Sequence, residues 1–198
     1  ELSRLLEAGY APLESGFRRL DSGVMMVAAL HRLHGVKGRM VDWWLDRHFS
    51  PEEFHRWHPG DHVSWSWDAR RGAAIVEHRV EGGIQRLKIQ RRDAAAYFDP
   101  EHLAEAAVSA AICSRGGPAE GDGWTSHVVH VCRDTDDGCE MRSRFFLGDF
   151  DPPLPPPGPA QAKVGSAAAA RAILQHTLEE YAHLARFLPE VYARRASC

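Results

Sequence analysis

The chain has 198 residues, of which 44% are hydrophobic and 26% charged, and its formal net charge is −3. This length suits one domain with a sizeable core. The charge argues against a nucleic-acid partner or an anionic membrane surface. No apolar run approaches the roughly 20 residues that cross a bilayer, and the first residues lack the order of a signal peptide. We therefore expect a cytoplasmic protein that binds no membrane.

Cysteine and histidine usage narrows the chemistry. The four cysteines show no C-x-x-C spacing, which indicates reduced thiols rather than a disulfide framework or a zinc-cysteine site. The twelve histidines are the one compositional excess, and they favour metal or proton chemistry only weakly.

The N-terminal third predicts an arm, a strand and two short helices. Residues 1–22 are rich in turn formers and predict an arm that packs on a domain of residues 23–198. Residues 24–33 are apolar and predict a buried strand, whereas residues 39–49 have helical periodicity. Ser50 and Pro51 then suit the N-cap and first position of a second helix that runs to Trp57.

Beyond Pro59-Gly60 the hydrophobic pattern changes to the period of two that strands require. The predicted strands are residues 62–67, 73–80, 84–90, 104–113, 126–132 and 139–147, with a loop at 115–123. The alanine-rich segment 104–113 has a composition that also allows a helix, and we assign it to a strand. Residues 151–165 contain the run DPPLPPPGP and predict a semi-rigid linker.

The last strand carries two arginines in alternation. Arg142 and Arg144 lie two residues apart, so both side chains should face the same side of the sheet. We expect them to form ion pairs with acidic neighbours such as Glu140 or Asp149.

Residues 166–198 predict one long amphipathic helix, interrupted in composition only by Pro189. His176 and Glu180 are four residues apart and therefore lie on one helical face. An imidazole and a carboxylate at this spacing can reach one divalent cation. The alternative is a surface pair exposed to water, which the helix alone does not exclude.

The order of elements predicts an α+β fold. A strand, two short helices, a run of antiparallel strands and a long C-terminal helix together suit a curved sheet wrapped around that helix, the helix-grip arrangement. In this fold the inward face of the helix, with His176 and Glu180, lines the interior rather than the surface.

Further metal ligands are available near the start of the sheet. His58 and His62 flank a Pro-Gly turn in the segment WHPGDH, and Glu77 and Glu81 share one side of a strand by parity. Two histidines and two carboxylates suit zinc or another first-row divalent ion. Alternatively, WHPGDH is a turn whose Asp61 caps backbone groups.

Four motifs together resemble one enzyme family. They are MVDWWLDRHFSPEEFHRWHPGDHVSWSWD at 40–68, EHRVEGGIQRLKIQ at 77–90, GCEMRSRFFLGDF at 138–150 and ILQHTLEEYAHLARFLPEVY at 173–192. In this order they resemble the 2,4-diacetylphloroglucinol hydrolase and phloretin hydrolase family, over roughly residues 9–192. The resemblance implies a Bet v 1-like or START-like helix-grip domain that binds Zn²⁺ and hydrolyses an aryl–acyl carbon–carbon bond of a small aromatic or acyl ketone. It also implies a homodimer.

The resemblance also implies the site. The expected zinc ligands are His62, Glu81, His176 and Glu180. Glu77 remains an alternative to Glu81, because the segment after His62 is shorter than the family pattern suggests. Besides Glu81, the expected catalytic residue is His130 of SHVVHV, which matches a histidine placed for proton transfer.

Three residues predict a changed substrate pocket. Phe54, Trp65 and Phe145 stand where the family pattern has a tyrosine, a polar residue and a tyrosine. An apolar pocket discriminates less sharply than one that hydrogen-bonds a hydroxyl. We therefore expect a substrate other than diacetylphloroglucinol. The alternatives are a ligand-binding helix-grip protein without catalysis, and a metal-dependent hydrolase of another bond type.

Overall fold

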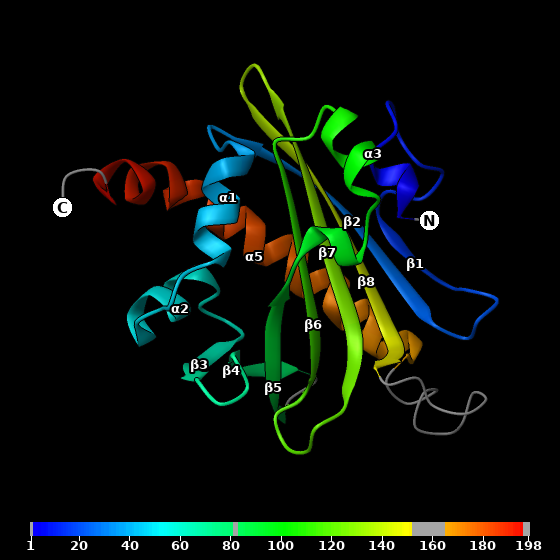
Figure 1. The fold of residues 1–198 in the computed structure, drawn as a ribbon. Helices are drawn as coiled ribbons and strands as arrows, with labels where there is room; N and C mark the ends of the chain where they lie inside the picture. The colour runs from blue at the N-terminus through cyan, green and yellow to red at the C-terminus, as the bar shows by residue number, and fades with distance from the viewer. Residues whose placement is uncertain (1, 81–82, 152–164, 196–198) are drawn as a thin grey trace.

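The computed structural model describes residues 2–80, 83–151 and 165–195, and its central feature is one antiparallel sheet of eight strands. The strand order is β1-β2-β8-β7-β6-β5-β4-β3. The strands are β1 (Gly16–Arg19), β2 (Met25–His34), β3 (His62–Asp68), β4 (Ala73–Val80), β5 (Gly83–Arg92), β6 (Ala110–Pro118), β7 (Trp124–Thr135) and β8 (Gly138–Asp151). The helix α5 (Ala167–Arg194) lies along one face of this sheet (Figure 1).

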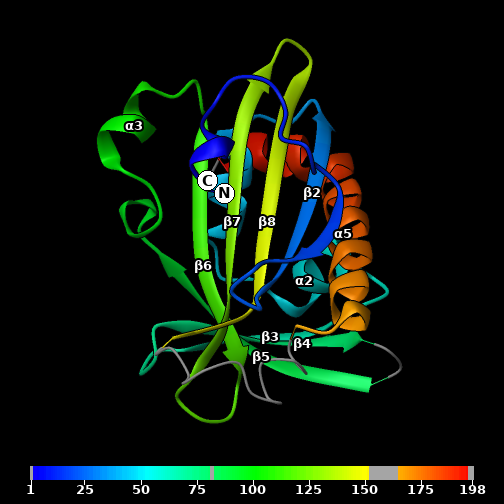
Figure 2. The same ribbon diagram turned by 90° about the vertical axis from the view of Figure 1, so that its right-hand side faces the viewer.

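The sheet is strongly bent. Strands β3, β4 and β5 run across the ends of the long strands β6, β7 and β8, so that the sheet closes around α5 (Figure 2). Two glycines of β6 accompany the bend, and a Cβ at Gly117 would lie only 2.9 Å from the carbonyl oxygen of Gly123. A side chain there would force the backbones apart. The predicted helix-grip arrangement is confirmed.

The helix α5 buries one stripe against the inner face of the sheet. Tyr181, Leu184, Phe187 and Leu188 of the helix belong to the largest hydrophobic cluster, which also takes in residues of α1, α2 and the inner faces of the strands. Helical spacing of these side chains explains why one face of α5 is buried and the other exposed. The N-cap is Ser166, whose hydroxyl accepts a hydrogen bond from the Ala169 amide.

The outer face of the sheet is covered as well. The 3₁₀ helices η1 (Ser3–Leu5) and η2 (Ala94–Ala96) and the short helix α3 (Pro100–Glu105) lie on the side opposite α5. Leu5, Leu6 and Phe98 pack there against outward-facing residues of β6 and β7. Because both faces are buried, β7 carries apolar residues on both sides.

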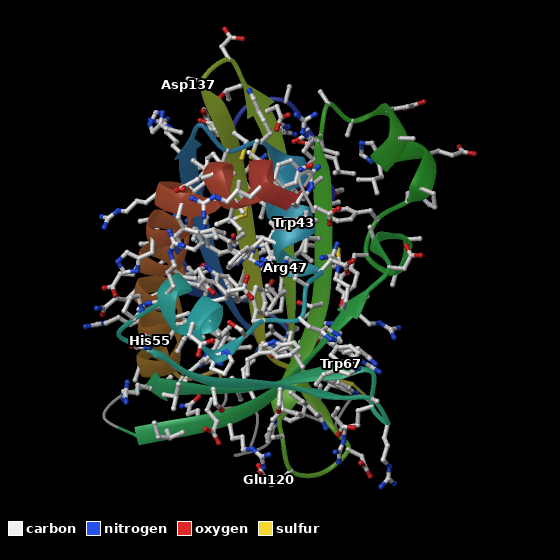
Figure 3. The ribbon with its side chains drawn as sticks, turned by 90° about the vertical axis from the view of Figure 1, so that its left-hand side faces the viewer. Trp43, Arg47, His55, Trp67, Glu120 and Asp137 are labelled. Atoms are coloured by element: carbon white, nitrogen blue, oxygen red, sulfur yellow. The ribbon has the colours of Figure 1, made fainter. Side chains whose placement is uncertain are left out.

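Two short helices follow β2 in the chain and lead into β3. Helix α1 (Gly38–Leu45) packs on the C-terminal part of α5, where Figure 3 labels Trp43 and Arg47. Helix α2 (Pro51–Trp57) begins with a capping box, in which the Ser50 hydroxyl accepts from the Glu53 amide and the Glu53 carboxylate accepts from the Ser50 amide. Both helices were predicted from the sequence. After α2 ends, a turn leads directly into β3.

The structure corrects three sequence predictions. Residues 100–105 form α3, because Asp99 caps the helix at the His102 amide and Pro100 starts it, and the strand expected at 104–113 begins only at Ala110. That strand continues to Pro118 by pairing with β5, which shortens the loop expected at 115–123. Within the predicted arm 1–22, Gly16–Arg19 pairs with β2 as an edge strand too short to give a periodic signal. The proline-rich run of the predicted linker, 152–164, lies outside the described residues.

Within the described ranges, no helix combines the length and the apolar character needed to cross a bilayer.

Candidate metal centre

Four elements bring a group of histidines and carboxylates together inside the sheet. His58 and Asp61 come from the turn after α2, His62 begins β3, His78 lies on β4, and His176 and Glu180 lie on α5. His62 is 1% exposed and Glu180 9% exposed, so both are withdrawn from water. Ring nitrogens of His62, His78 and His176 all lie within 4.8 Å of one another, close enough to converge on one metal ion. We call these six residues the histidine cluster.

A β-bulge directs His62 into the cluster. The register shifts between His62 and Ser64, so that His62 pairs with His78 whereas Ser64 pairs with Glu77. Trp65 faces the inner core, and strict alternation from it would turn His62 outward. The extra residue of the bulge restores the inward direction.

Hydrogen bonds at Nδ1 orient two of the imidazoles. Nδ1 of His62 lies 2.8 Å from the carbonyl oxygen of Phe54, and Nδ1 of His176 lies 2.9 Å from the Asp61 carboxylate. A carbonyl or a carboxylate oxygen only accepts, so Nδ1 carries the proton in both rings. Nε2 is then the nitrogen with a free lone pair, and in each ring it faces Glu180. Partners of this kind at the far nitrogen are typical of metal-binding histidines.

Glu180 lies between these two nitrogens. Its carboxylate oxygens are 3.5 Å from Nε2 of His62 and 3.9 Å from Nε2 of His176, both too long for good hydrogen bonds. Burial alone would raise the pKa of Glu180, but the contact with His62 and the neighbouring His176 outweigh it and lower the pKa to about 2. The carboxylate is therefore ionised at neutral pH and is able to act as a ligand.

His58 has the opposite proton arrangement. The amide of Asp61 donates to Nδ1 of His58 at 3.2 Å, so the proton of the neutral ring is on Nε2. That Nε2 is 3.6 Å from the Asp61 carboxylate. Burial lowers the pKa of His58, which favours this neutral ring. His58, Asp61 and His176 are also close enough to hold an ion, and Nε2 of His58, like that of His62, is buried without a hydrogen-bond partner among the described residues.

The residues present fit a zinc ion. Nε2 of His62 is buried and has no hydrogen-bond partner among the described residues. An orphaned buried imidazole nitrogen is costly unless something binds it. Imidazole nitrogens with one carboxylate are the donor set that zinc and neighbouring first-row ions prefer.

Of the two strand glutamates, Glu81 lies outside the described residues. The other, Glu77, does not join this group. Glu77 precedes His78 on β4 and faces the other side of the sheet, where its carboxylate accepts a 2.8 Å hydrogen bond from Ser64 and lies 3.7 Å from Arg86. Glu77, the alternative to Glu81 as a metal ligand, therefore lies away from the histidine cluster.

His130 is buried on β7, where it contacts β8 and α5. Its Nδ1 is 2.7 Å from the Ser143 hydroxyl, and its Nε2 is 3.4 Å from the hydroxyl of Tyr181, the residue after Glu180. Burial lowers the pKa of His130 to about 4. The ring is therefore neutral at pH 7.

The three predicted pocket residues have different surroundings. Phe54 stacks on His62 with ring centroids 3.9 Å apart, and Phe145 lies edge-on to His130 at 5.8 Å. Trp65 instead packs beside Phe49 at 5.8 Å and His48 at 5.2 Å. Phe54 and Phe145 are therefore at the cluster and at His130, whereas Trp65 belongs to the adjoining aromatic core.

Sequence reasoning missed His78 and gave Asp61 only a capping role. A signal for His78 was present, since alternation along β4 puts it on the inner face with Ala74 and Val76. Asp61 gave no such signal, because its partner His176 is 115 residues away.

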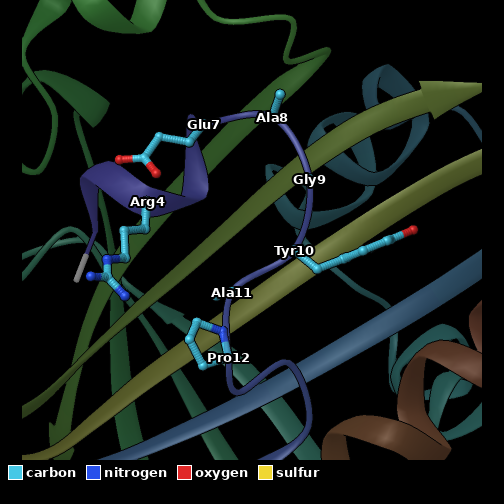
Figure 4. A pocket seen from close by; sticks show the side chains of 7 residues that line it. All are labelled: Arg4, Glu7, Ala8, Gly9, Tyr10, Ala11 and Pro12. Carbon is cyan, nitrogen blue, oxygen red and sulfur yellow. The ribbon is translucent and has the colours of Figure 1, made fainter.

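Two hollows elsewhere do not involve the cluster. One of about 200 Å³ lies under the N-terminal segment and is lined by residues 4 and 7–12 (Figure 4). Another of about 410 Å³ is lined by Leu2, Tyr97, His127, Phe146 and Asp149. Neither shares a residue with the histidine cluster.

Comparison with known proteins identifies relatives of similar sequence. Two curated relatives are 2,4-diacetylphloroglucinol hydrolases. The one from Pseudomonas protegens is 24% identical over 97% of this chain and 72% of its own length, and the one from Pseudomonas sp. is 23% identical over 97% and 75%.

Solved structures similar to this chain include Ara h 8.0201, with a TM-score of 0.47 and 13% identity over 84% of this chain and 98% of that one. A protein from Arthrobacter aurescens has a TM-score of 0.46 and 13% identity, covering 89% and 92%. The family model described as the DAPG hydrolase PhiG domain matches residues 1–193, which is nearly the whole chain. The chain therefore belongs to the DAPG hydrolase family.

Proposed function

We propose that this protein is a zinc-dependent hydrolase that cleaves a carbon–carbon bond between a ring carbon and an acyl group, releasing a carboxylic acid. The observation that carries the proposal is the shared direction of His62 and His176. Both rings are held at Nδ1, and both turn Nε2 toward the ionised Glu180. Membership of the DAPG hydrolase family supports the same reaction class.

In this reaction the metal ion would activate an oxygen atom, and a side chain of the protein would transfer the proton. A bound zinc ion polarises a substrate oxygen or lowers the pKa of water. Hydrolysis of an aryl ketone adds hydroxide to the acyl carbon and a proton to the ring carbon, so one proton must travel between the two. His130 is neutral and buried, and its Nε2 faces the end of Tyr181 next to the cluster. We assign it the role of taking the proton from water and returning it to the ring carbon.

The substrate proposed is more apolar than diacetylphloroglucinol. Phe145 lies against His130, and Phe54 covers one face of His62. Neither side chain can bond a ring hydroxyl, whereas a site built around such bonds discriminates strongly. The homodimer implied by the resemblance stays a prediction, which light scattering would test.

Product analysis tests the bond that is cleaved. The zinc-loaded protein is incubated with a series of acylphenols that differ in ring hydroxylation, in water enriched in ¹⁸O. We expect equal amounts of carboxylic acid and deacylated ring, with label in the acid, and the best turnover for substrates with fewer hydroxyls than diacetylphloroglucinol. Failure of every acylphenol, combined with hydrolysis of the matching phenyl esters, would contradict carbon–carbon cleavage.

Replacing His130 with glutamine tests the proton path. We expect the turnover number to fall by about 10²–10⁴-fold, the range of general acid–base catalysis, with zinc content unchanged. The measurement is turnover alongside metal analysis. His127→Gln, on the outer side of the same strand, is the matched control. Near-normal turnover of the His130 variant would remove His130 from the mechanism.

A further inference from the structure

His78 sits where strand, bulge and helix converge. It is directly opposite His62 in the β3–β4 register, and its side chain faces α5 with those of Ala74 and Val76. The ring centroids of His62 and His78 are 4.9 Å apart, and those of His78 and His176 are 5.0 Å apart. Three imidazoles from three elements therefore surround one point beside Glu180.

These spacings match those of imidazoles that share one ion. With a zinc–nitrogen distance of about 2.1 Å and tetrahedral angles, two ligating nitrogens lie roughly 3.4 Å apart and their ring centroids roughly 5 Å apart. The nitrogens of His62, His78 and His176 are already within 4.8 Å of one another. Closing the set therefore requires side-chain movements of about an ångström, which rotamer adjustment supplies.

We propose that His78 is a metal ligand in this protein, so that the ligand set is His62, His78, His176 and Glu180. The proposal rests on the proposed function, since it concerns the same centre. It differs from the ligand set implied by family resemblance, in which Glu81 completes the site. Three nitrogen donors and one carboxylate fill the four positions of a tetrahedral zinc ion, and a substrate oxygen or water would then expand the coordination to five.

Three single substitutions on one strand and its end separate the two ligand sets. The apo-protein is titrated with zinc against a chromophoric chelator, and the visible spectrum of its cobalt form is recorded. For His78→Gln we expect affinity to fall by about 100-fold or more, because one of four metal bonds is lost, and the cobalt spectrum to change. Glu81→Gln and the matched control Glu77→Gln should both bind zinc within about threefold of the parent.

A rescue variant distinguishes a lost ligand from a damaged fold. His78→Cys keeps a zinc-binding side chain, and we expect it to recover most of the affinity and add a sulfur–cobalt charge-transfer band. Loss of affinity in both His78→Gln and Glu81→Gln, with recovery in His78→Cys, would still support His78.

The opposite pattern would overturn the proposal. Weak zinc binding by Glu81→Gln, together with parent-like affinity and an unchanged cobalt spectrum for His78→Gln, would restore the set implied by the family and leave the proposed function standing. Folded parent protein that binds no zinc would overturn both.

Discussion

Replacing His176 with alanine is expected to abolish metal binding and turnover together. His176 supplies Nε2 from α5, and its Nδ1 is the group that holds Asp61. A bound metal ion contributes several kcal/mol of transition-state stabilisation, so we expect turnover to fall by about 10³-fold or more. Metal analysis and turnover are measured on the same preparation.

His102→Ala is the matched control, since His102 is an exposed histidine on α3, on the opposite side of the sheet. It should retain both metal and activity. Undiminished turnover in His176→Ala, with circular dichroism like that of the parent, would contradict a metal centre at the histidine cluster.

Replacing Glu14 with alanine is expected to lower the free energy of unfolding strongly. The Glu14 carboxylate accepts hydrogen bonds from Arg142 at 2.6 and 3.2 Å and from Arg144 at 2.8 Å. The two arginine side chains are only 2% and 4% exposed. Removing their shared partner leaves two buried positive charges uncompensated, which typically costs about 3–5 kcal/mol. Urea denaturation of parent and variant measures the difference.

The pH dependence of this difference provides a second check. Burial raises the pKa of Glu14, but the hydrogen bonds from Arg142 and Arg144 outweigh it and hold the pKa below its usual value. A lowered carboxyl pKa contributes stability that is complete above the unfolded value and is lost as pH falls through the folded value. The stability difference between the parent and Glu14→Ala should therefore be constant above about pH 5.5 and shrink below about pH 4.5.

Glu7→Gln, in the same N-terminal segment but exposed, serves as the control and should unfold like the parent. A parent-like unfolding midpoint for Glu14→Ala would show that the two arginines are satisfied without it.

The pairing of these arginines differs from the prediction made from sequence. Glu140 and Asp149 are near in the chain, but Glu140 instead accepts from Arg32 and from Tyr10. Arg142 and Arg144 face the N-terminal segment, because the outer face of β8 is covered by it. Their partner is more than 120 residues away, and periodicity carries no information about such distant pairs.

Short-range physics explains what could be read from the chain. His176 and Glu180 share a face because α-helices have 3.6 residues per turn. The capping box at Ser50 and Glu53 defines the start of α2, and the Pro-Gly turn that follows brings the chain back at His62. These local rules, with the family motifs, predict His62, His176 and Glu180, three residues of the histidine cluster.

By itself, then, the sequence determined the long amphipathic helix, the run of strands, and His62, His176 and Glu180 as residues able to hold a metal. Only the tertiary structure decided that His78 and Asp61 join them, that Glu77 turns away, and that a bulge points His62 inward. The physical reason is the separation along the chain of the residues that interact. Helical spacing and capping act within a few residues, whereas strand register, bulges and the choice of buried ion-pair partners depend on segments that meet only when the sheet closes around α5.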